Sequence, residues 1–200
     1  MKLVTFAASA GLLILVSACA ESVPAASPES PGGMEQGGEQ QEQQEQQEQK
    51  ETRKAEAKLQ SPPGMKLAGD VKLVEENGAV KITVDVEDAP SGYKGIHIHE
   101  RGDCSDPKGK SMGEHFAPGQ HNHGIPGKQA EHHLGDLGNI LITAEGKGHL
   151  EMTVPEANLK PGDPMSFLGK AVIIHEGEDK GVQPSGGAGD PIACGRIDPK

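Results

Sequence analysis

Apolar and polar residues alternate over short stretches through most of the chain after residue 53. Alternation over four to eight residues is typical of β-strands that bury one face. Turn-forming residues at 76–78, 91–92 and 145–148 separate several of these stretches. The stretches lie at residues 55–59, 70–75, 79–86, 95–99, 139–143, 149–154, 171–175 and 191–197. The pattern therefore predicts eight strands and an all-β sandwich or barrel.

Two of the predicted connections are long, one from His99 to Asn139 and one from His175 to Pro191. Loops of that length in a compact domain are usually functional or disordered. The first connection carries most of the histidines, which favours a functional loop. No stretch has a convincing amphipathic helical pattern, and this disfavours an α/β fold.

The first 18 residues have the pattern of a signal peptide, with Lys2 followed by a short apolar run. The run ends in Val-Ser-Ala before Cys19, a sequence that resembles a bacterial lipobox. That resemblance implies lipidation of Cys19, and Ala20 then favours the outer membrane. A plain secretory signal is the alternative reading.

Residues 19–53 are poor in apolar side chains, and a Gln/Glu-rich repeat runs from Gly37 to Glu51. Such a segment cannot bury enough apolar surface to offset its ordering entropy, so we predict a disordered tether. A coiled coil is disfavoured because the repeat has no apolar seam. The predicted folded domain is therefore residues 54–200.

The composition indicates which side chains fill the core and which kind of partner is disfavoured. Tyr93, Phe116 and Phe167 are the only aromatic residues of that domain, so the core is expected to be aliphatic. The formal net charge of the whole chain, −11, argues against nucleic acid as a partner.

All nine histidines of the chain lie between His97 and His175. Two residues one apart on a strand point to the same side, so His97 and His99 can present two imidazoles to one ion. The spacing from His133 to Asp136 brings a carboxylate near another imidazole. Solvated polar loops could also collect histidines, but enough ligands are present for two ions. Imidazole suits both copper and zinc.

Five segments carry a more specific pattern, and they occur in this order: GIHIHERGDC, GEHFAP, HGIPGKQAEHHLGDLGN, AVIIHE and GAGDPIACG. Together they resemble the copper/zinc superoxide dismutase family from about Lys54 onward. The resemblance implies an eight-stranded Greek-key fold with two long functional loops, and one copper and one zinc per subunit.

The resemblance also implies a role for each matching residue. The copper ligands would be His97, His99, His115 and His175, and the zinc ligands would be His115, His123, His133 and Asp136. His115 would be shared by both metals and would act in catalysis. The carboxylate of Asp179 would hydrogen-bond His97 and His123. His121, His132 and His149 have no role in the pattern and are expected to be exposed.

The implied reaction is dismutation of superoxide to dioxygen and hydrogen peroxide, in a monomer or homodimer attached to the cell envelope by a lipid. The alternative is a non-enzymatic module of the same fold that binds or delivers copper and zinc. Every metal-ligand position of the family pattern is filled, which favours the enzyme.

Cys104 and Cys194 remain as a pair once Cys19 is set aside. In an exported domain an even pair favours a disulfide over free thiols. One position departs from the family pattern, because Pro191 stands where an arginine usually helps attract the anion. Asp190 precedes it, and its negative charge is expected to weaken that attraction further.

Overall fold

The computed structural model describes residues 52–200; the predicted signal peptide, Cys19 and the Gln/Glu-rich repeat lie outside this range. Within it the chain forms nine strands and one short 3-10 helix, η1. These are β1 (Arg53–Gln60), β2 (Ala68–Glu76), β3 (Ala79–Glu87), β4 (Gly92–His99), η1 (Lys110–Met112), β5 (Asp136–Ile142), β6 (Gly148–Pro155), β7 (Ala171–His175), β8 (Pro191–Arg196) and β9 (Asp198–Pro199). No helix in these residues is long and apolar enough to cross a bilayer.

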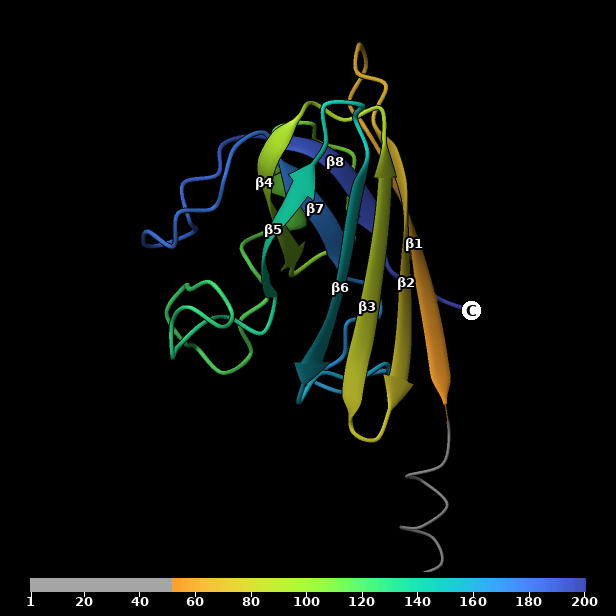
Figure 1. Ribbon diagram of the computed structural model, residues 1–200. Helices are drawn as coiled ribbons and strands as arrows, with labels where there is room; N and C mark the ends of the chain where they lie inside the picture. The colour runs from red at the N-terminus through yellow and green to blue at the C-terminus, as the bar shows by residue number, and fades with distance from the viewer. Residues whose placement is uncertain (1–51) are drawn as a thin grey trace, which may run out of the picture.

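The strands form one antiparallel sheet that closes on itself in the order β2-β3-β6-β5-β4-β7-β8-β1, with β1 pairing back to β2 (Figure 1). The connections from β3 to β4 and from β6 to β7 each pass over two intervening strands, as in a Greek key. The predicted eight-stranded all-β fold is therefore confirmed. β9 is an unpredicted addition that pairs with Ala55 and Glu56, near the start of β1.

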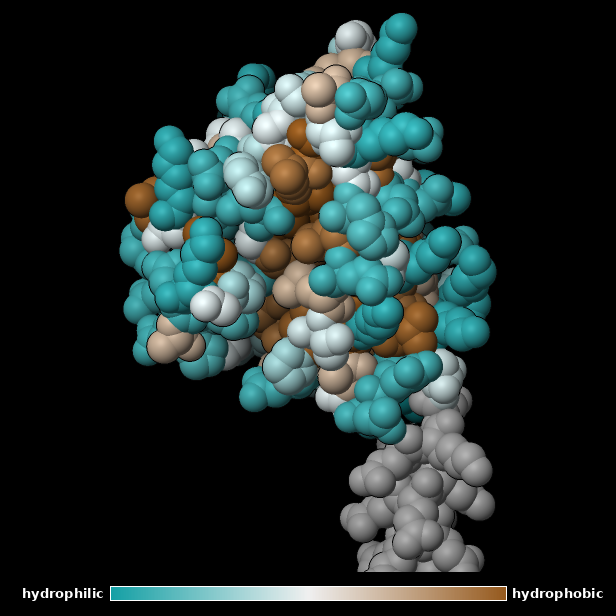
Figure 2. Space-filling model, viewed as in Figure 1, coloured by the Kyte–Doolittle hydropathy of each residue, from teal (hydrophilic) through white to brown (hydrophobic). Residues whose placement is uncertain are grey.

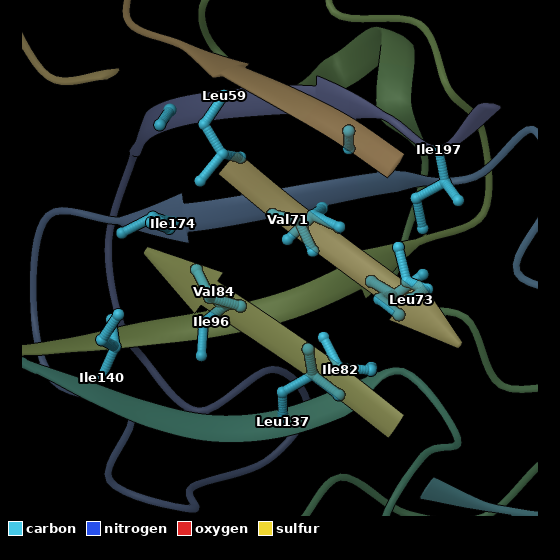
Figure 3. Packing of buried hydrophobic residues seen from close by; sticks show 14 of the residues in the cluster. Leu59, Val71, Leu73, Ile82, Val84, Ile96, Leu137, Ile140, Ile174 and Ile197 are labelled. Carbon is cyan, nitrogen blue, oxygen red and sulfur yellow. The ribbon is translucent and has the colours of Figure 1, made fainter. Parts of the chain in front are cut away.

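β1 begins at Arg53, one residue before the predicted start of the domain, because Arg53 pairs with Glu75 in the β1–β2 ladder. In β1, β2 and β3, buried and accessible residues alternate as the sequence pattern predicts. The buried side chains meet inside the barrel, where Leu59, Val71 and Ile82 are almost fully buried (Figure 3). The core is aliphatic apart from Phe116 and Phe167, whose rings meet edge to face.

β4 differs from β1, β2 and β3 because all its residues from Lys94 to His99 are buried, as are all those of β7. Ile96 and Ile98 are fully buried in the core cluster. His97 and His99 alternate with these two residues along the strand, so their side chains point to its opposite side. Both long loops lie on the same side of the barrel, next to β4, β5 and β7 (Figure 1). The loops therefore bury the outer face of β4 and its two histidines.

β5 and β6 are joined by a single residue pair, Ile142 with Gly148. Apolar side chains gather on this face of the barrel (Figure 2). They include Leu141, which is half exposed, and the partly buried Leu150 and Met152, which pack against the core. The barrel is thus closed by side chains more than by backbone hydrogen bonds along this seam.

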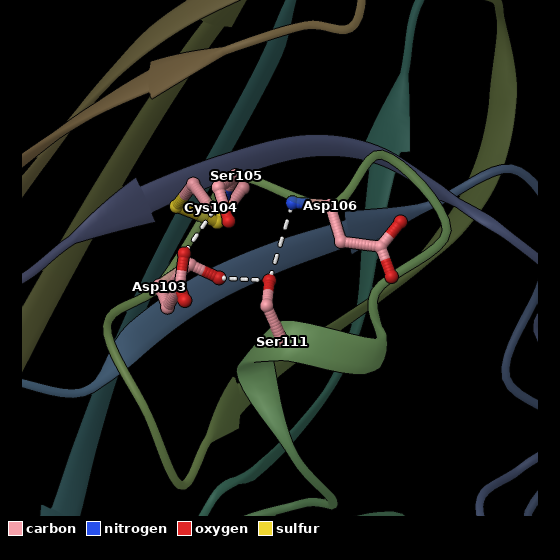
Figure 4. The surroundings of a disulfide bond; sticks show 6 residues. Asp103, Cys104, Ser105, Asp106 and Ser111 are labelled. Atoms are coloured by element: carbon pink, nitrogen blue, oxygen red, sulfur yellow. Dashed lines mark hydrogen bonds between the residues drawn. A yellow bond between two sulfur atoms is a disulfide. The ribbon is translucent and has the colours of Figure 1, made fainter.

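The predicted disulfide is confirmed between Cys104 and Cys194, with the two Cα atoms 5.8 Å apart. It attaches the loop after β4 to β8. The loop is further held near the bond by Ser111, whose hydroxyl donates to the Asp103 carbonyl and accepts from the Asp106 backbone N–H (Figure 4). The first long loop is therefore fixed to the barrel before it reaches His115.

Candidate metal centre

Four histidines meet on the outer side of β4, and we call them the first histidine group. Each offers a ring nitrogen within 4.8 Å of the others. The group consists of His97, His99, His115 and His175.

Strand pairing brings these four residues together from three parts of the chain. β4 carries His97 and His99, and His97 pairs with Ile173 of β7, two residues before His175. The backbone of His115 forms an isolated antiparallel bridge with His99. The ring centroids of His97 lie 4.0 Å from His115 and 5.0 Å from His175.

The second group shares His115 with the first and adds His123, His133 and Asp136. The carboxylate of Asp136 is its centre. Its oxygens lie 2.8 Å from Nδ1 of His115, 3.0 Å from Nδ1 of His123 and 3.3 Å from Nδ1 of His133. Since Nδ1 of His115 is turned toward Asp136, its Nε2 is left for the first group.

Asp179, on the second long loop, connects the two groups. Its Oδ2 accepts a hydrogen bond from Nε2 of His97 at 2.9 Å, and its Oδ1 accepts one from Nε2 of His123 at 3.1 Å. A carboxylate in this position fixes the tautomer and orientation of both rings, so that Nδ1 of each carries the lone pair.

The hydrogen bonding of the ring nitrogens tests whether the two groups suit metal ions. Nδ1 of His99 donates to the carbonyl oxygen of Gly113 at 2.8 Å. Nδ1 of His175 donates to the carbonyl oxygen of Gly189 at 2.9 Å. Five buried ring nitrogens in the described residues make no hydrogen bond. They are His97 Nδ1, His99 Nε2, His123 Nδ1, His133 Nδ1 and His175 Nε2.

Buried polar atoms are rarely left without partners, so these five nitrogens call for another occupant. Each belongs to one of the two groups. The carboxylate oxygens of Asp136 lie beside Nδ1 of His123 and His133 without hydrogen-bonding geometry, as expected of ligands that share an ion. The residues present therefore fit one ion in each group, with imidazole and carboxylate donors that suit copper and zinc.

Burial favours the neutral form of four of these imidazoles, which is the form that binds metals. Loss of hydration lowers the pKa of His97 to about 4 and that of His99 to about 3. Burial also lowers the pKa of His175 and of His133. The imidazoles of His97, His99, His133 and His175 are thus neutral at neutral pH.

The two carboxylates remain ionised despite their surroundings. Burial opposes ionisation of Asp179, but hydrogen bonds from His97, from the Gly181 backbone and from His123 outweigh it and lower its pKa to about 2. Burial likewise opposes ionisation of Asp136. Hydrogen bonds again outweigh burial and lower the pKa of Asp136, and the largest contribution among them comes from His115.

The three remaining histidines lie outside both groups. His121 is exposed, and His149 is exposed on β6 next to Asp85. The expectation that His132 is exposed is wrong: it is half-buried, and its Nδ1 donates to the carbonyl oxygen of His133. His121 and His132 line a separate pocket of about 340 Å³ together with Met165. His133, and not His132, thus belongs to the second group.

Sequence reasoning missed one residue that holds the site together, Asn139. Its side chain forms two hydrogen bonds with the backbone of Asp179. Asn139 is the last residue of the HLGDLGN segment. Nothing in the sequence distinguishes it from an asparagine in an ordinary turn.

Comparison with known proteins agrees with this geometry. The family model described as copper/zinc superoxide dismutase matches residues 67–197. A "Superoxide dismutase [Cu-Zn] 2" from Aquifex aeolicus is 36% identical over 149 residues, which cover 72% of this chain and 86% of the relative. "Superoxide dismutase [Cu-Zn] A" from Xenopus laevis is 38% identical over 144 residues, which cover 65% of this chain and 91% of the relative.

A solved structure supports the same relationship at the level of the fold. The crystal structure of the clock protein EA4 superposes with a TM-score of 0.63 at 30% sequence identity, covering 72% of this chain and 93% of that one. The family model alone spans well over half of the 200 residues. The chain belongs to the copper/zinc superoxide dismutase family, whose members are enzymes with copper and zinc as cofactors.

Proposed function

We propose that the first histidine group binds copper, that the second group binds zinc, and that the protein dismutates superoxide at this centre to protect the cell envelope. Copper would be held by His97, His99, His115 and His175. Zinc would be held by His115, His123, His133 and Asp136. The observation that carries the proposal is the set of five buried ring nitrogens without hydrogen bonds, all of them in these two groups.

When bound, copper supplies the one-electron redox chemistry that converts superoxide to dioxygen and hydrogen peroxide, and zinc supplies a redox-inert positive charge. The side chains of the protein orient the metal-binding histidines and transfer protons. His115 faces both groups, so its Nε2 can hold a proton and release it to product while Nδ1 stays on the side of Asp136. Asp179 keeps His97 and His123 in the tautomers that present Nδ1.

A comparison of two histidine variants tests the site. The chain without residues 1–18 is loaded with both metals, and superoxide consumption is measured together with the copper and zinc content. We expect one copper and one zinc per chain. His115→Ala should lower turnover by about 10²- to 10⁴-fold, the range for loss of a proton-transferring group. His121→Ala should change neither property, because His121 lies outside both groups.

Turnover at the background level in the unaltered protein with both metals bound would contradict the enzymatic proposal. It would favour the non-enzymatic metal-binding module. An equal loss of turnover in His115→Ala and His121→Ala would contradict a catalytic role for His115.

The envelope location rests on the sequence before residue 52. The pattern that ends at Cys19 supports a lipid anchor, and the Gln/Glu-rich segment supports a tether between that anchor and the barrel. Cys19→Ser in the full chain should move the protein from the membrane fraction to the soluble fraction. Membrane association that survives this substitution would contradict lipidation at Cys19.

A further inference from the structure

His123 belongs to the second group and is almost fully buried, but it lies in a part of the first long loop that has no regular secondary structure. Strand ladders fix the backbones of His97 and His175. No ladder does this for His123. Its backbone N–H and carbonyl oxygen need other partners, because a buried backbone group without a hydrogen bond is costly.

Both partners come from one side chain, that of Gln183 on the second long loop. Oε1 of Gln183 accepts from the His123 backbone N–H at 3.2 Å, and Nε2 of Gln183 donates to the His123 carbonyl oxygen at 2.8 Å. A primary amide can form this pair of bonds because it carries an acceptor and a donor side by side. Gln183 thus gives His123 the pairing that a neighbouring strand gives to a residue in a sheet.

The imidazole of His123 is held from the same loop. Its Nε2 donates to Oδ1 of Asp179 at 3.1 Å, four residues before Gln183. A hydrogen bond of 2.7 Å from the Gly186 N–H to the Val182 carbonyl oxygen closes the turn that contains Gln183. The second loop therefore holds His123 at three atoms, which leaves Nδ1 of its ring without a hydrogen bond.

A second glutamine, Gln129, connects the same two loops at residues outside the metal groups. Its Oε1 accepts from the Ile125 backbone N–H at 2.7 Å, and its Nε2 donates to the Gly181 carbonyl oxygen at 3.3 Å. Neither Ile125 nor Gly181 belongs to either group. Both glutamines therefore link the loops, but Gln183 alone of the two binds the backbone of a proposed metal ligand.

We infer that Gln183 is a positioning residue of the second group, because its amide fixes the backbone from which His123 presents Nδ1. Asp179 sets the direction of the ring. A ring whose backbone shifts would still not keep Nδ1 at a constant place beside His133 and Asp136, and metal–ligand bonds tolerate little variation in length. The inference rests on the proposed function, in which His123 is a zinc ligand.

Gln183→Met tests the inference, since methionine is similarly long and unbranched but forms neither hydrogen bond. Gln129→Met is the matched control. Both glutamines are exposed, so both variants should fold. Chelator competition gives the dissociation constants of zinc and of copper in the full chain. The absorption spectrum of Co²⁺ bound in place of zinc reports the geometry of the second group, and hydrogen exchange of the His123 N–H in the metal-free protein reports the backbone contact.

The effect of Gln183→Met should be confined to the second group. We expect zinc binding to weaken by about 10- to 100-fold, the usual effect of removing support behind a ligand. Copper binding should change much less, because His123 belongs to the second group alone. The Co²⁺ spectrum should shift, and the His123 N–H should exchange faster. Gln129→Met should leave all four measurements close to those of the unaltered protein.

The outcomes distinguish this inference from the proposed function. Zinc affinity that is equal in the unaltered protein and in Gln183→Met would overturn the inference alone. Equal losses of zinc affinity in the two variants, or equal losses of zinc and copper affinity in Gln183→Met, would also overturn it, because they would indicate a general loosening of the loops. An unaltered protein that binds no zinc would contradict the proposed function, and the inference with it.

Discussion

Asn139 and Asp179 exchange two hydrogen bonds: Nδ2 of the Asn139 side chain donates to the backbone carbonyl oxygen of Asp179 at 2.9 Å, and the backbone N–H of Asp179 donates to Oδ1 of the Asn139 side chain at 2.8 Å. Asn139 lies on β5, three residues after Asp136, which belongs to the second group. The pair therefore attaches the second long loop to the strand that carries a proposed zinc ligand. It positions the carboxylate that orients His97 and His123.

Asn139→Ala should weaken metal binding by about 10- to 100-fold, the usual effect of removing support behind a ligand. Competition with a chelator for copper and for zinc measures this change. Asn158→Ala is the control, because Asn158 also donates to a loop aspartate, Asp163, but lies outside both groups. Equal metal affinities in the two variants would contradict a positioning role for Asn139.

The carboxylate of Asp179 lies so close to the backbone of Gly186 that a side chain at position 186 would collide with it. The φ of Gly186 is +81°, and a Cβ atom there would lie 2.2 Å from Oδ1 of Asp179 and 2.9 Å from Nε2 of His123. Gly186→Ala should therefore displace the carboxylate in addition to straining the backbone. We expect metal affinity to fall and the free energy of unfolding to decrease by more than about 1 kcal/mol.

Gly162→Ala separates these two effects. Gly162 has a φ of +79°, but a Cβ atom there would have no neighbour within 4 Å. This variant should lose only the backbone contribution, about 1 kcal/mol in chemical unfolding, and keep its metals. If Gly186→Ala behaves in the same way, the contact with Asp179 has no consequence for the site.

The metal-free protein should lose stability as the pH falls below about 6.5. His97 and His99 have pKa values of about 4 and about 3 when folded, against 6.5 when unfolded. Between these values the unfolded chain binds more protons, so the free energy of unfolding falls with decreasing pH. From pH 6.5 to 5 each imidazole contributes a loss of about 2 kcal/mol.

Asp179 adds to this loss at lower pH. Its lowered pKa stabilises the folded state above its ordinary value of 3.8, and that stabilisation disappears as the pH falls through about 2. Urea unfolding at several pH values measures the trend. The protein loaded with both metals should show a similar slope above pH 5, because both imidazoles are unprotonated there in either folded form, and a steeper slope below about pH 4, where a bound ion would keep them unprotonated. Identical pH profiles with and without metals below about pH 4 would contradict the assignment of these histidines as ligands.

Removal of the disulfide should destabilise the protein strongly. Cys104 and Cys194 are 90 residues apart, and a cross-link that closes a loop of this size contributes about 4 to 5 kcal/mol under the chain-entropy model. Cys104→Ser combined with Cys194→Ser, and reduction of the unaltered protein, should lower the free energy of unfolding by similar amounts. A loss below about 1 kcal/mol in either experiment would refute this expectation.

The fold was largely predictable because alternation marks each strand locally. The eight predicted stretches all became strands, and His97 and His99 point to one side as a two-residue period requires. β9 could not be predicted, because Asp198 and Pro199 have no apolar pattern. These residues are a strand only because the start of β1 offers them a pairing edge.

The contacts between loops were beyond prediction from sequence. Lys108 and Asp190 are 82 residues apart, and nothing local in either segment indicates that they meet. Their contact depends on the disulfide, on the packing of Gly109 against Pro191 and on the return of the chain into β8. The same holds for Asn139 and Asp179, which are 40 residues apart.

The disulfide also sets an order of events during biosynthesis. Cys194 lies 90 residues after Cys104, so its thiol can reach Cys104 only after β5, β6 and β7 have been made. Until then the loop that carries Lys108 and His115 lacks its covalent attachment to β8. A chain truncated before Cys194 could therefore contain all seven residues of the two metal groups and still lack the cross-link that holds one of their loops in place.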